Sequence, residues 1–288
     1  MPNSLLADIN EIKFLWIIIL LDLKRNSKYQ LIEATGKRTR KSSIYTPKQT
    51  EDFKISRSKF ADFLICPRCF YLDRVVGLDA PGTPGWALNE ATDILYKKEF
   101  DICRKNQTPH RLFEQYGLNH FVPFQHPEID KWRDSMHHGL SARFGNTNIM
   151  LFGGIDDVWV NKETDKLVVV DYKSQSSERE ITTNNYLNGI FKQGYKMQMD
   201  FYVYLLREMG FNVHPDAYFV VCNGDRTAAD FNGLMKFDEY LIPYEWNTEW
   251  IHNEVINMID CINSESLPES NKSCKNCAYA AQRAIKEL

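Results

Sequence analysis

The segment Asn148–Gln175, with the sequence NIMLFGGIDDVWVNKETDKLVVVDYKSQ, decides the fold class of this 288-residue chain. Two runs within it, Ile149–Asn161 and Lys166–Lys173, are rich in β-branched and aromatic residues, a composition typical of β-strands. The polar residues between them, Lys162–Asp165, have the length of a short hairpin loop. We therefore predict an antiparallel β-hairpin at the centre of the fold.

The register of this hairpin brings two acidic residues together. If Asn161 pairs with Lys166, Asp156 lies directly opposite Asp171, and their Cβ atoms are roughly 4.5–5.5 Å apart. Because side chains alternate along a strand, Lys173 shares the face of Asp171. The rest of that face is apolar and consists of Val158, Val160, Leu167 and Val169.

Like charges opposite each other destabilise a sheet unless a cation lies between them. Hard divalent cations bind carboxylate oxygens, so this face predicts a metal site made by Asp156 and Asp171, with Lys173 beside it. The alternative is a surface hairpin with two solvated acids. That alternative does not explain why both acids lie on the apolar face, whereas Asp157 is expected on the other face with Ile155.

Gly153-Gly154-Ile155-Asp156 followed by Val169-Val170-Asp171-Tyr172-Lys173 resembles the core motif of the PD-(D/E)xK nuclease superfamily. The branch it resembles most is that of the RecB-like and Cas4-like nucleases. The resemblance implies an α/β (α+β) fold of the restriction-endonuclease type, a mixed central sheet flanked by helices. It also implies that Asp156 and Asp171 hold Mg²⁺ or Mn²⁺ and that Lys173 is catalytic.

Two flanking segments extend the resemblance. Ser56, Ser58, Phe60, Phe63, Cys66, Pro67 and Phe70 fit the first-helix pattern of RecB-like nucleases. In a helix expected over Leu187–Met209, Gln198 and Tyr202 share one face and fit the motif Q-x-x-x-Y, whose glutamine lies beside the active site in that family. Gln198 is therefore a candidate catalytic residue that positions the lysine or the nucleotide. The alternative is that it is a solvated helix residue.

A histidine ligand of the related nucleases has no counterpart here. The amphipathic helix expected over Leu88–Arg104 carries Asp93 near the position of that histidine. A carboxylate suits Mg²⁺ or Mn²⁺, so Asp93 is a candidate third metal ligand, or else an exposed helix acid like Glu90. We expect His137 and His138 to be surface residues.

Four cysteines form two C-x-x-C pairs near the two ends of the chain, Cys66/Cys69 and Cys274/Cys277. Four thiolates suit tetrahedral Zn²⁺ or an iron–sulfur cluster, and either would tie the ends of the domain together. In the RecB-like and Cas4-like relatives, one upstream and three C-terminal cysteines usually hold a [4Fe–4S] cluster. This chain departs from that arrangement with two and two cysteines, so the choice between the cluster and Zn²⁺ stays open, with the cluster favoured. The remaining three cysteines, Cys103, Cys222 and Cys261, are expected to be ordinary semi-buried residues.

Composition sets the outer limits of the interpretation. Hydrophobic residues make up 43% of the chain, enough for a large core, and the net charge of −3 argues against a broad basic surface for nucleic acid. Seven cysteines without a recognisable signal peptide favour a reducing cytoplasm. We expect residues 51–288 to form the nuclease-like domain, including the C-terminal cysteine motif. Residues 1–50 are a separate N-terminal extension and basic linker.

The extension contains an apolar run, Phe14–Leu21, and a basic run, Lys37–Lys41. The apolar run is too short to cross a bilayer, so no membrane association is expected. An appended helix followed by a flexible linker is one interpretation of the extension, and an arm that touches DNA or a partner is the other.

Together these features predict a divalent-metal-dependent deoxyribonuclease that hydrolyses phosphodiester bonds. The resemblance places it among exonuclease-type enzymes of DNA repair, recombination or CRISPR adaptation, acting on single- or double-stranded DNA with a helicase or CRISPR-type protein as partner. An alternative is a non-cleaving nucleic-acid-binding or scaffold protein that retains the fold, and another is an enzyme of the same fold that acts on RNA.

Overall fold

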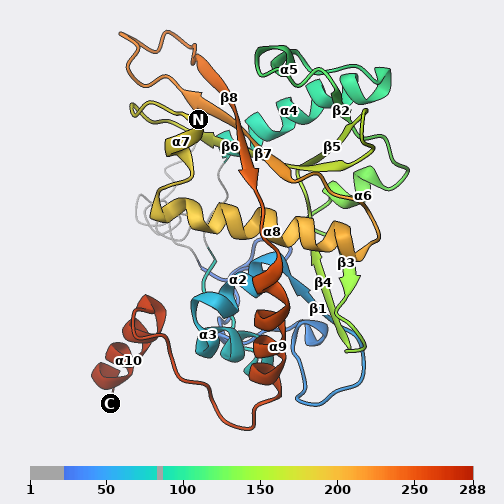
Figure 1. Ribbon diagram of the computed structural model, residues 1–288. Helices are drawn as coiled ribbons and strands as arrows, with labels where there is room; N and C mark the ends of the chain where they lie inside the picture. The colour runs from blue at the N-terminus through green and yellow to red at the C-terminus, as the bar shows by residue number, and fades with distance from the viewer. Residues whose placement is uncertain (1–22, 83–86, 288) are drawn as a thin grey trace, which may run out of the picture.

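The structure is a computed structural model that describes residues 23–82 and 87–287. Its architecture is mixed α/β, with two sheets flanked by helices, which confirms the predicted fold class (Figure 1). The apolar run Phe14–Leu21 lies outside the described residues. No helix in the described part of the chain combines the length and the hydrophobicity needed to cross a membrane.

A five-stranded sheet forms the centre of the molecule. Its strands follow the spatial order β2 (Phe121–Pro123), β5 (Asp157–Asn161), β6 (Leu167–Gln175), β7 (Asp216–Gly224) and β8 (Phe237–Glu245). Only β6 and β7 run parallel, and the other neighbouring pairs are antiparallel. Both faces of this sheet are covered, and β6 is therefore apolar and buried over most of its length.

A long helix lies on each face of this sheet. One is α4 (Ala87–Asn106), which contacts β6 and β2, and the other is α8 (Gln193–Glu208). The helix α8 belongs to the connection between β6 and β7, together with α7 (Thr183–Tyr186) and η3 (Ile190–Lys192). Parallel neighbouring strands need a crossover of this kind, because a short turn cannot reverse the chain twice.

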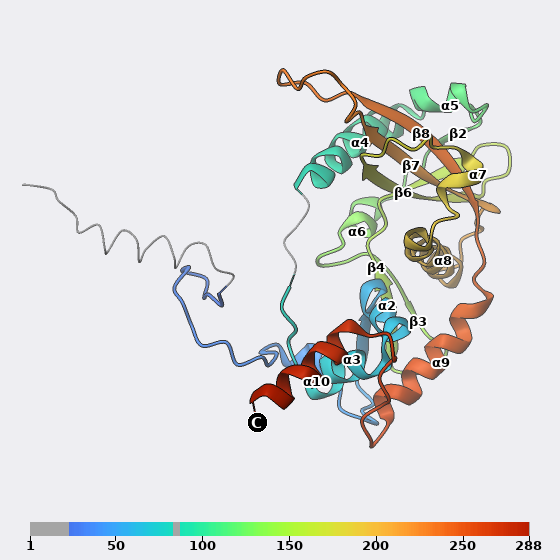
Figure 2. The ribbon, with the colours of Figure 1, turned by 90° about the vertical axis from the view of Figure 1, so that its left-hand side faces the viewer.

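A smaller sheet lies on the far side of α8 (Figure 2). It contains β1 (Phe53–Ser56), β4 (Ile149–Gly153) and β3 (Leu140–Arg143), with β4 in the middle. Helix α2 (Arg57–Ile65) contacts β1, β4 and α9 (Glu249–Asn263). The main hydrophobic core fills the space between the two sheets and around α8, and a second core lies beneath α4.

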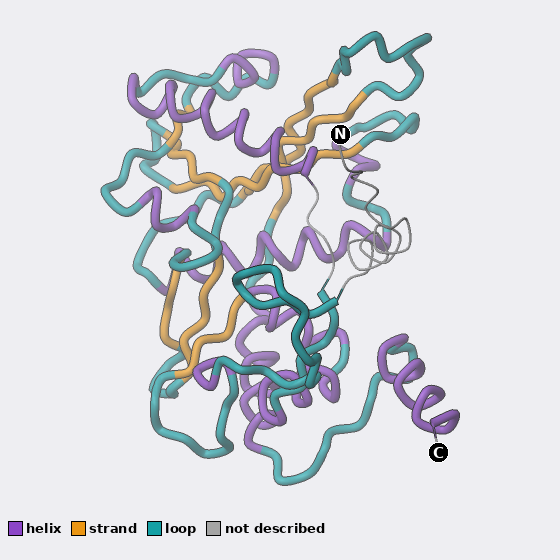
Figure 3. The backbone as a smooth tube through the Cα atoms, turned by 180° about the vertical axis from the view of Figure 1, so that it is seen from behind, coloured by secondary structure: helices purple, strands orange, loops and turns teal. Residues whose placement is uncertain are grey.

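The remaining helices are short, except for the last. They are η1 (Lys41–Ser43), α3 (Pro67–Tyr71), the π-helical turn η2 (Leu72–Val76), α5 (Arg111–Gln115), α6 (Ile129–Arg133) and α10 (Lys275–Glu287). Ser56 caps the N-terminus of α2, since its hydroxyl accepts a hydrogen bond from the Lys59 amide. The C-terminal α10 has no buried side chain, and beyond Cys277 it extends away from the body (Figure 3).

The sequence interpretation of Ile149–Asn161 as one strand is wrong. The chain breaks at Gly154–Asp156, so β4 belongs to the small sheet and β5 to the large one. A Cβ atom on Gly154 would lie 2.5 Å from the Cα of Ser135, so the break requires glycine. As a result Ile155 packs into the core around α8 and does not share the face of Asp157.

Two further differences concern the segment between β6 and β7. The helix expected from Leu187 begins later, because Gly189 precedes the short η3 and α8 starts only at Gln193. The segment before it contains α7, whose N-terminus is closed by a capping box between Thr182 and Asn185. Both changes place residues of this connection close to the end of β6.

Part of the N-terminal fifty residues packs against the rest of the chain. Tyr45 is only 2% exposed, stacks edge-on against Phe53 and hydrogen-bonds Asn263 through its hydroxyl. In the basic run, Arg38 pairs with Asp73 at 2.5 Å. These contacts hold the described end of the extension on the domain, and the boundary between residues 50 and 51 stays a prediction.

Candidate active site and cysteine cluster

The hairpin has the predicted register. Val158 pairs with Val169 and Val160 with Leu167, so the same register sets Asp156, the residue before β5, opposite Asp171. The apolar members of this face belong to the core around α8, and the two acids therefore lie at the α8 side of the sheet.

Asp171 is the most enclosed acid of the site, with 0% of its surface exposed. Its Oδ1 oxygen accepts a hydrogen bond of 2.7 Å from the Gln198 side-chain amide. The Oδ2 oxygen forms an ion pair with the Lys173 ammonium. Gln198 also donates to the Tyr202 hydroxyl at 3.2 Å. The structure thus joins three of the predicted residues, Asp171, Lys173 and Gln198.

Asp156 completes this group from the other strand. Its Oδ2 oxygen accepts a hydrogen bond of 2.9 Å from the Tyr172 backbone amide. Burial, followed by the repulsion of Asp171, raises the pKa of Asp156 to about 7. Burial lowers the pKa of Lys173, but the Asp171 and Asp156 carboxylates outweigh it and hold that pKa above its ordinary value. Two carboxylates therefore share one ammonium, and the site has an excess of negative charge.

The glycine of the G-x-I-D motif has a packing role. A Cβ atom on Gly153 would lie 2.9 Å from the Tyr202 ring, so a side chain there would push α8 away from the hairpin. Ile155 is 1% exposed and donates its backbone amide to the Trp132 carbonyl, which fixes the chain just before Asp156. The motif thus sets how closely α8 packs against the hairpin and how the Asp156 side chain is oriented.

Asp93 lies on α4, near the site but outside its hydrogen-bond network. Its carboxylate pairs with Lys97 at 2.9 Å. Burial and the charge of Asp156 raise the pKa of Asp93, which shows that the two acids influence each other. Its role as a third ligand stays a prediction.

Two residues beside the site were not predicted from the sequence. The Tyr195 ring lies under the Lys173 ammonium, with 4.6 Å between the nitrogen and the ring centre. The Lys192 ammonium lies 4.8 Å from the centre of the same ring. Neither residue belongs to the quoted motifs, and only the fold of the β6–α8 connection brings them to the end of β6.

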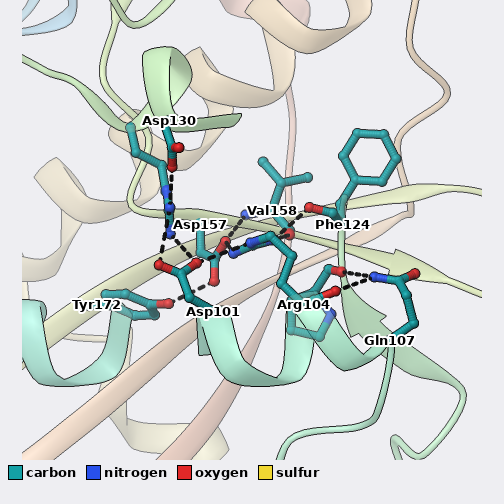
Figure 4. A network of polar contacts seen from close by, with 10 residues as sticks. Asp101, Arg104, Gln107, Phe124, Asp130, Asp157, Val158 and Tyr172 are labelled. Atoms are coloured by element: carbon teal, nitrogen blue, oxygen red, sulfur yellow. Dashed lines mark hydrogen bonds and ion pairs between the residues drawn. The ribbon is translucent and has the colours of Figure 1, made fainter. Parts of the chain in front are cut away.

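A separate polar network occupies the other face of the hairpin (Figure 4). The Asp157 Oδ1 oxygen accepts hydrogen bonds of 2.5 Å from Arg104 and 2.8 Å from the Val158 amide. Its Oδ2 oxygen accepts one of 2.8 Å from the Tyr172 hydroxyl. Asp101 and Arg133 extend the network toward the surface. Both oxygens of Asp157 are therefore satisfied by the protein itself.

The four cysteines of the two C-x-x-C pairs meet at one point, with all four sulfur atoms within 4.8 Å of one another. The Sγ atoms are separated by 3.7 Å for Cys66 and Cys277, 3.6 Å for Cys69 and Cys274, and 3.4 Å for Cys69 and Cys277. Burial disfavours the Cys66 thiolate, but amide hydrogen bonds from Cys69 and Asn271 lower its pKa to about 7. This is the only group of three or more His, Cys, Asp or Glu in the described ranges that is gathered closely enough to hold one ion.

The other predicted surface and core residues stay outside these sites. His137 and His138 are exposed, as expected. Cys103, Cys222 and Cys261 take no part in the cysteine cluster.

Comparison with known proteins assigns the family. The sequence model of the PD-(D/E)XK nuclease superfamily matches residues 102–282, more than half of the chain. The chain belongs to the PD-(D/E)XK nuclease superfamily. The matched region holds Asp156, Asp171, Lys173 and Gln198, and the second cysteine pair. No curated protein matches the sequence.

Two solved structures are similar to this superfamily member at a low level. A protein from Eubacterium rectale titled "Putative exonuclease" has 13% sequence identity and a TM-score of 0.40, and the alignment covers 78% of this chain and 87% of that one. A protein titled SSO0001 has 13% identity and a TM-score of 0.29, with 82% of this chain and 87% of that one covered. Neither similarity is high enough to carry an argument, so the assignment rests on the sequence model.

Proposed function

We propose that this protein is a divalent-metal-dependent deoxyribonuclease whose centre is formed by Asp156, Asp171 and Lys173. The observation that carries the proposal is the pair of carboxylates, Asp156 and Asp171, which lie opposite each other on the hairpin and share the one ammonium of Lys173. Carboxylate oxygens with an excess of negative charge are the ligands that Mg²⁺ and Mn²⁺ prefer, so the residues present fit such an ion.

Each residue then has a distinct role. Asp156 and Asp171 hold the ion from opposite strands, and Asp93 is a third ligand or an acid that tunes Asp156. The ion supplies Lewis acidity at the scissile phosphate and at a bound water. Lys173 interacts with the negative charge that develops on the phosphate, and Gln198 fixes the Asp171 carboxylate through its 2.7 Å hydrogen bond.

The test is incubation of the purified protein with end-labelled single- and double-stranded DNA, and with RNA of the same sequence. We expect cleavage of DNA with Mg²⁺ or Mn²⁺ and none with EDTA. A wild-type protein that binds DNA but leaves it intact with either ion would favour the scaffold alternative. Preferential cleavage of the RNA would assign the enzyme to a different substrate class.

The finer family position is part of the same proposal. The first-helix pattern around Cys66 and the Gln198–Tyr202 pair support the RecB-like and Cas4-like branch. That branch acts on DNA ends together with helicase or CRISPR-type partners, which we propose as the context of this enzyme.

The cysteine cluster is proposed to hold one tetrahedral ion, Zn²⁺, in place of the [4Fe–4S] cluster that the resemblance implies first. The supporting observation is the spacing of the sulfurs, 3.4–3.7 Å for three pairs. Four sulfurs at about 2.3 Å from one ion lie about 3.8 Å apart at the corners of a tetrahedron. In a cubane cluster each thiolate binds a different iron, so its sulfurs are spread more widely.

Metal analysis of anaerobically purified protein separates the two groups. We expect one zinc per chain, little iron and no visible absorption. Because α10 has no buried side chain, Cys277→Ser should also release this helix, which limited proteolysis of the chain after Pro268 would detect. Four irons per chain with a brown colour would establish the cluster, and Cys103→Ser should change neither property.

A further inference from the structure

The connection between β6 and α8 brings a second lysine to the candidate active site. Lys192 is the last residue of η3, and its ammonium donates a hydrogen bond of 2.9 Å to the Gln175 side-chain carbonyl. The same ammonium lies 4.2 Å from the centre of the Tyr186 ring and 4.8 Å from that of Tyr195. Lys173 lies 4.6 Å from the Tyr195 ring. Two ammonium groups therefore share one aromatic ring at the end of β6.

The two lysines differ in their anionic partners. Lys173 is neutralised by its ion pair with Asp171. Lys192 forms no ion pair with a carboxylate among the residues that the structure describes, although it is half-buried. Burial, and after it the charge of Lys173, lowers the pKa of Lys192. A half-buried ammonium beside another cation is stabilised by an anion, and the anion that a nuclease brings to this place is a phosphate.

Exposed apolar side chains immediately precede this lysine. Phe191 is 89% exposed and Ile190 is 78% exposed. An isolated exposed apolar residue needs no explanation. Here Ile190 and Phe191 directly precede Lys192, which has no carboxylate partner among the described residues and lies at the edge of the site. Proteins that bind single-stranded nucleic acid use the same combination, a cation for the phosphate and an aromatic ring on which the base stacks.

We propose that residues Ile190–Lys192 form a subsite for one unpaired nucleotide next to the scissile phosphate. Lys192 binds the phosphate of that nucleotide, and Phe191 stacks on its base with Ile190 alongside. The subsite rests on the proposed nuclease function of the neighbouring carboxylates. It selects single-stranded nucleic acid, because a base inside a duplex has no free face for the ring.

The experiment measures binding, so that it does not depend on cleavage. Fluorescence anisotropy of a labelled thymidine oligonucleotide and of a matched duplex is recorded with Ca²⁺ in place of Mg²⁺ at several salt concentrations. Phe191→Ala should weaken single-strand binding by about 5- to 150-fold with an unchanged salt dependence. Lys192→Ala should reduce the slope of log K against log salt by about 0.7, the value for one phosphate contact on a single strand.

Matched variants separate binding from folding. Phe191→Tyr keeps the ring and should bind like the wild type. Lys192→Arg keeps the charge and should keep the salt slope of the wild type. Lys162→Ala removes an exposed lysine from the hairpin loop at the opposite end of β5 and β6, and it should leave the slope unchanged. Thermal unfolding of each variant verifies that it is folded.

The outcomes distinguish the subsite from the nuclease function. If the wild type cuts DNA while Phe191→Ala and Lys192→Ala bind the single strand as tightly as the wild type, the subsite is wrong and the nuclease function stands. If both variants lose binding as expected but the wild type cuts nothing, the subsite stands and the nuclease function falls. A wild-type protein that binds duplex as tightly as single strand, or binds neither, contradicts the subsite.

Discussion

The neighbouring residues Asp156 and Asp157 lie at opposite faces of one hairpin and have opposite surroundings. Asp157, with 0% exposure, receives three hydrogen bonds, from Arg104, from the Val158 amide and from the Tyr172 hydroxyl. Asp156 and Asp171 share the single ammonium of Lys173. On the face beneath α4 the carboxylate is fully paired, whereas on the face beneath α8 two carboxylates share one ammonium.

This difference separates a structural acid from a candidate ligand. A buried carboxylate that the protein itself neutralises contributes to folding, and removing its partner leaves an uncompensated charge. A pair of carboxylates with too few partners costs folding free energy unless a cation binds. Asp157 and Asp171 are equally buried, so burial does not distinguish their roles. They differ in their positive partners, because Asp157 pairs with Arg104 whereas Asp171 shares Lys173 with Asp156.

The largest expected effect is the loss of cleavage in Asp171→Asn. This change keeps the shape of the side chain and its contact with Gln198 but removes the ligand charge, so Mg²⁺ binding and DNA cleavage should both disappear. Calorimetric titration with Mn²⁺ beside a cleavage assay measures the two effects. Glu163→Gln in the exposed hairpin loop is the control and should behave like the wild type. Cleavage at the wild-type rate by Asp171→Asn would contradict the proposed metal centre.

The next effect is on stability, in Asp157→Ala. Arg104 is buried and would lose the buried one of its two carboxylate partners, because Asp101 is partly exposed. Removing one partner of a buried ion pair typically costs about 3–5 kcal/mol of unfolding free energy. Urea denaturation should show this loss, while the folded fraction keeps its cleavage rate. The double variant Asp157→Leu with Arg104→Met should recover part of the stability, because neither charge remains. A loss of cleavage without a loss of stability would mean that Asp157 belongs to the active centre.

Lys173→Ala should separate ion binding from chemistry. The protonated lysine has no lone pair with which to bind a metal. Its ammonium interacts with the negative charge of the transition state, so its loss should slow cleavage by about 10²–10³-fold. Mn²⁺ binding should persist. Lys173→Arg should restore little, because a planar guanidinium does not replace a compact ammonium beside Tyr195. Single-turnover kinetics on a labelled oligonucleotide measures the rate, and an unchanged rate would contradict the catalytic role.

The smallest expected effect is that of Gln198→Ala. It removes one hydrogen bond to a charged and buried oxygen, which typically contributes about 1.5–3 kcal/mol. Mn²⁺ affinity should fall by a comparable amount, because Asp171 loses its orientation. Gln193→Ala, on the exposed first turn of the same helix, is the matched control. If both substitutions lower the Mn²⁺ affinity equally, the effect comes from a change in α8 and not from the loss of the hydrogen bond to Asp171.

Local sequence was sufficient for the hairpin and its acids. The period of two in strands and the length of the loop predict which side chains share a face, and the structure confirms the pairing of Val158 with Val169. The spacing of Gln198 and Tyr202 likewise predicts their shared helix face, because four residues make about one helical turn. In each case the interacting residues lie close in the chain or belong to one regular element.

The break between β4 and β5 could not be predicted in this way. Both strands have strand-forming sequences, and the division at Gly154 depends on the approach of Ser135 from another segment. For the same reason the place of Ile155 was predicted wrongly. A local pattern reports the propensity of each residue, and it does not report which sheet the residue joins.

By itself, then, the sequence determined the hairpin register, the convergence of Asp156 and Asp171 on one face, and the presence of two cysteine pairs. Only the tertiary structure decided that Arg104 neutralises Asp157, that Lys192 and Tyr195 lie beside Lys173, and that the four cysteines meet. The physical reason is sequence separation. Contacts within a hairpin or a helix turn follow from backbone periodicity, whereas contacts between residues far apart in the chain depend on how whole helices and sheets pack.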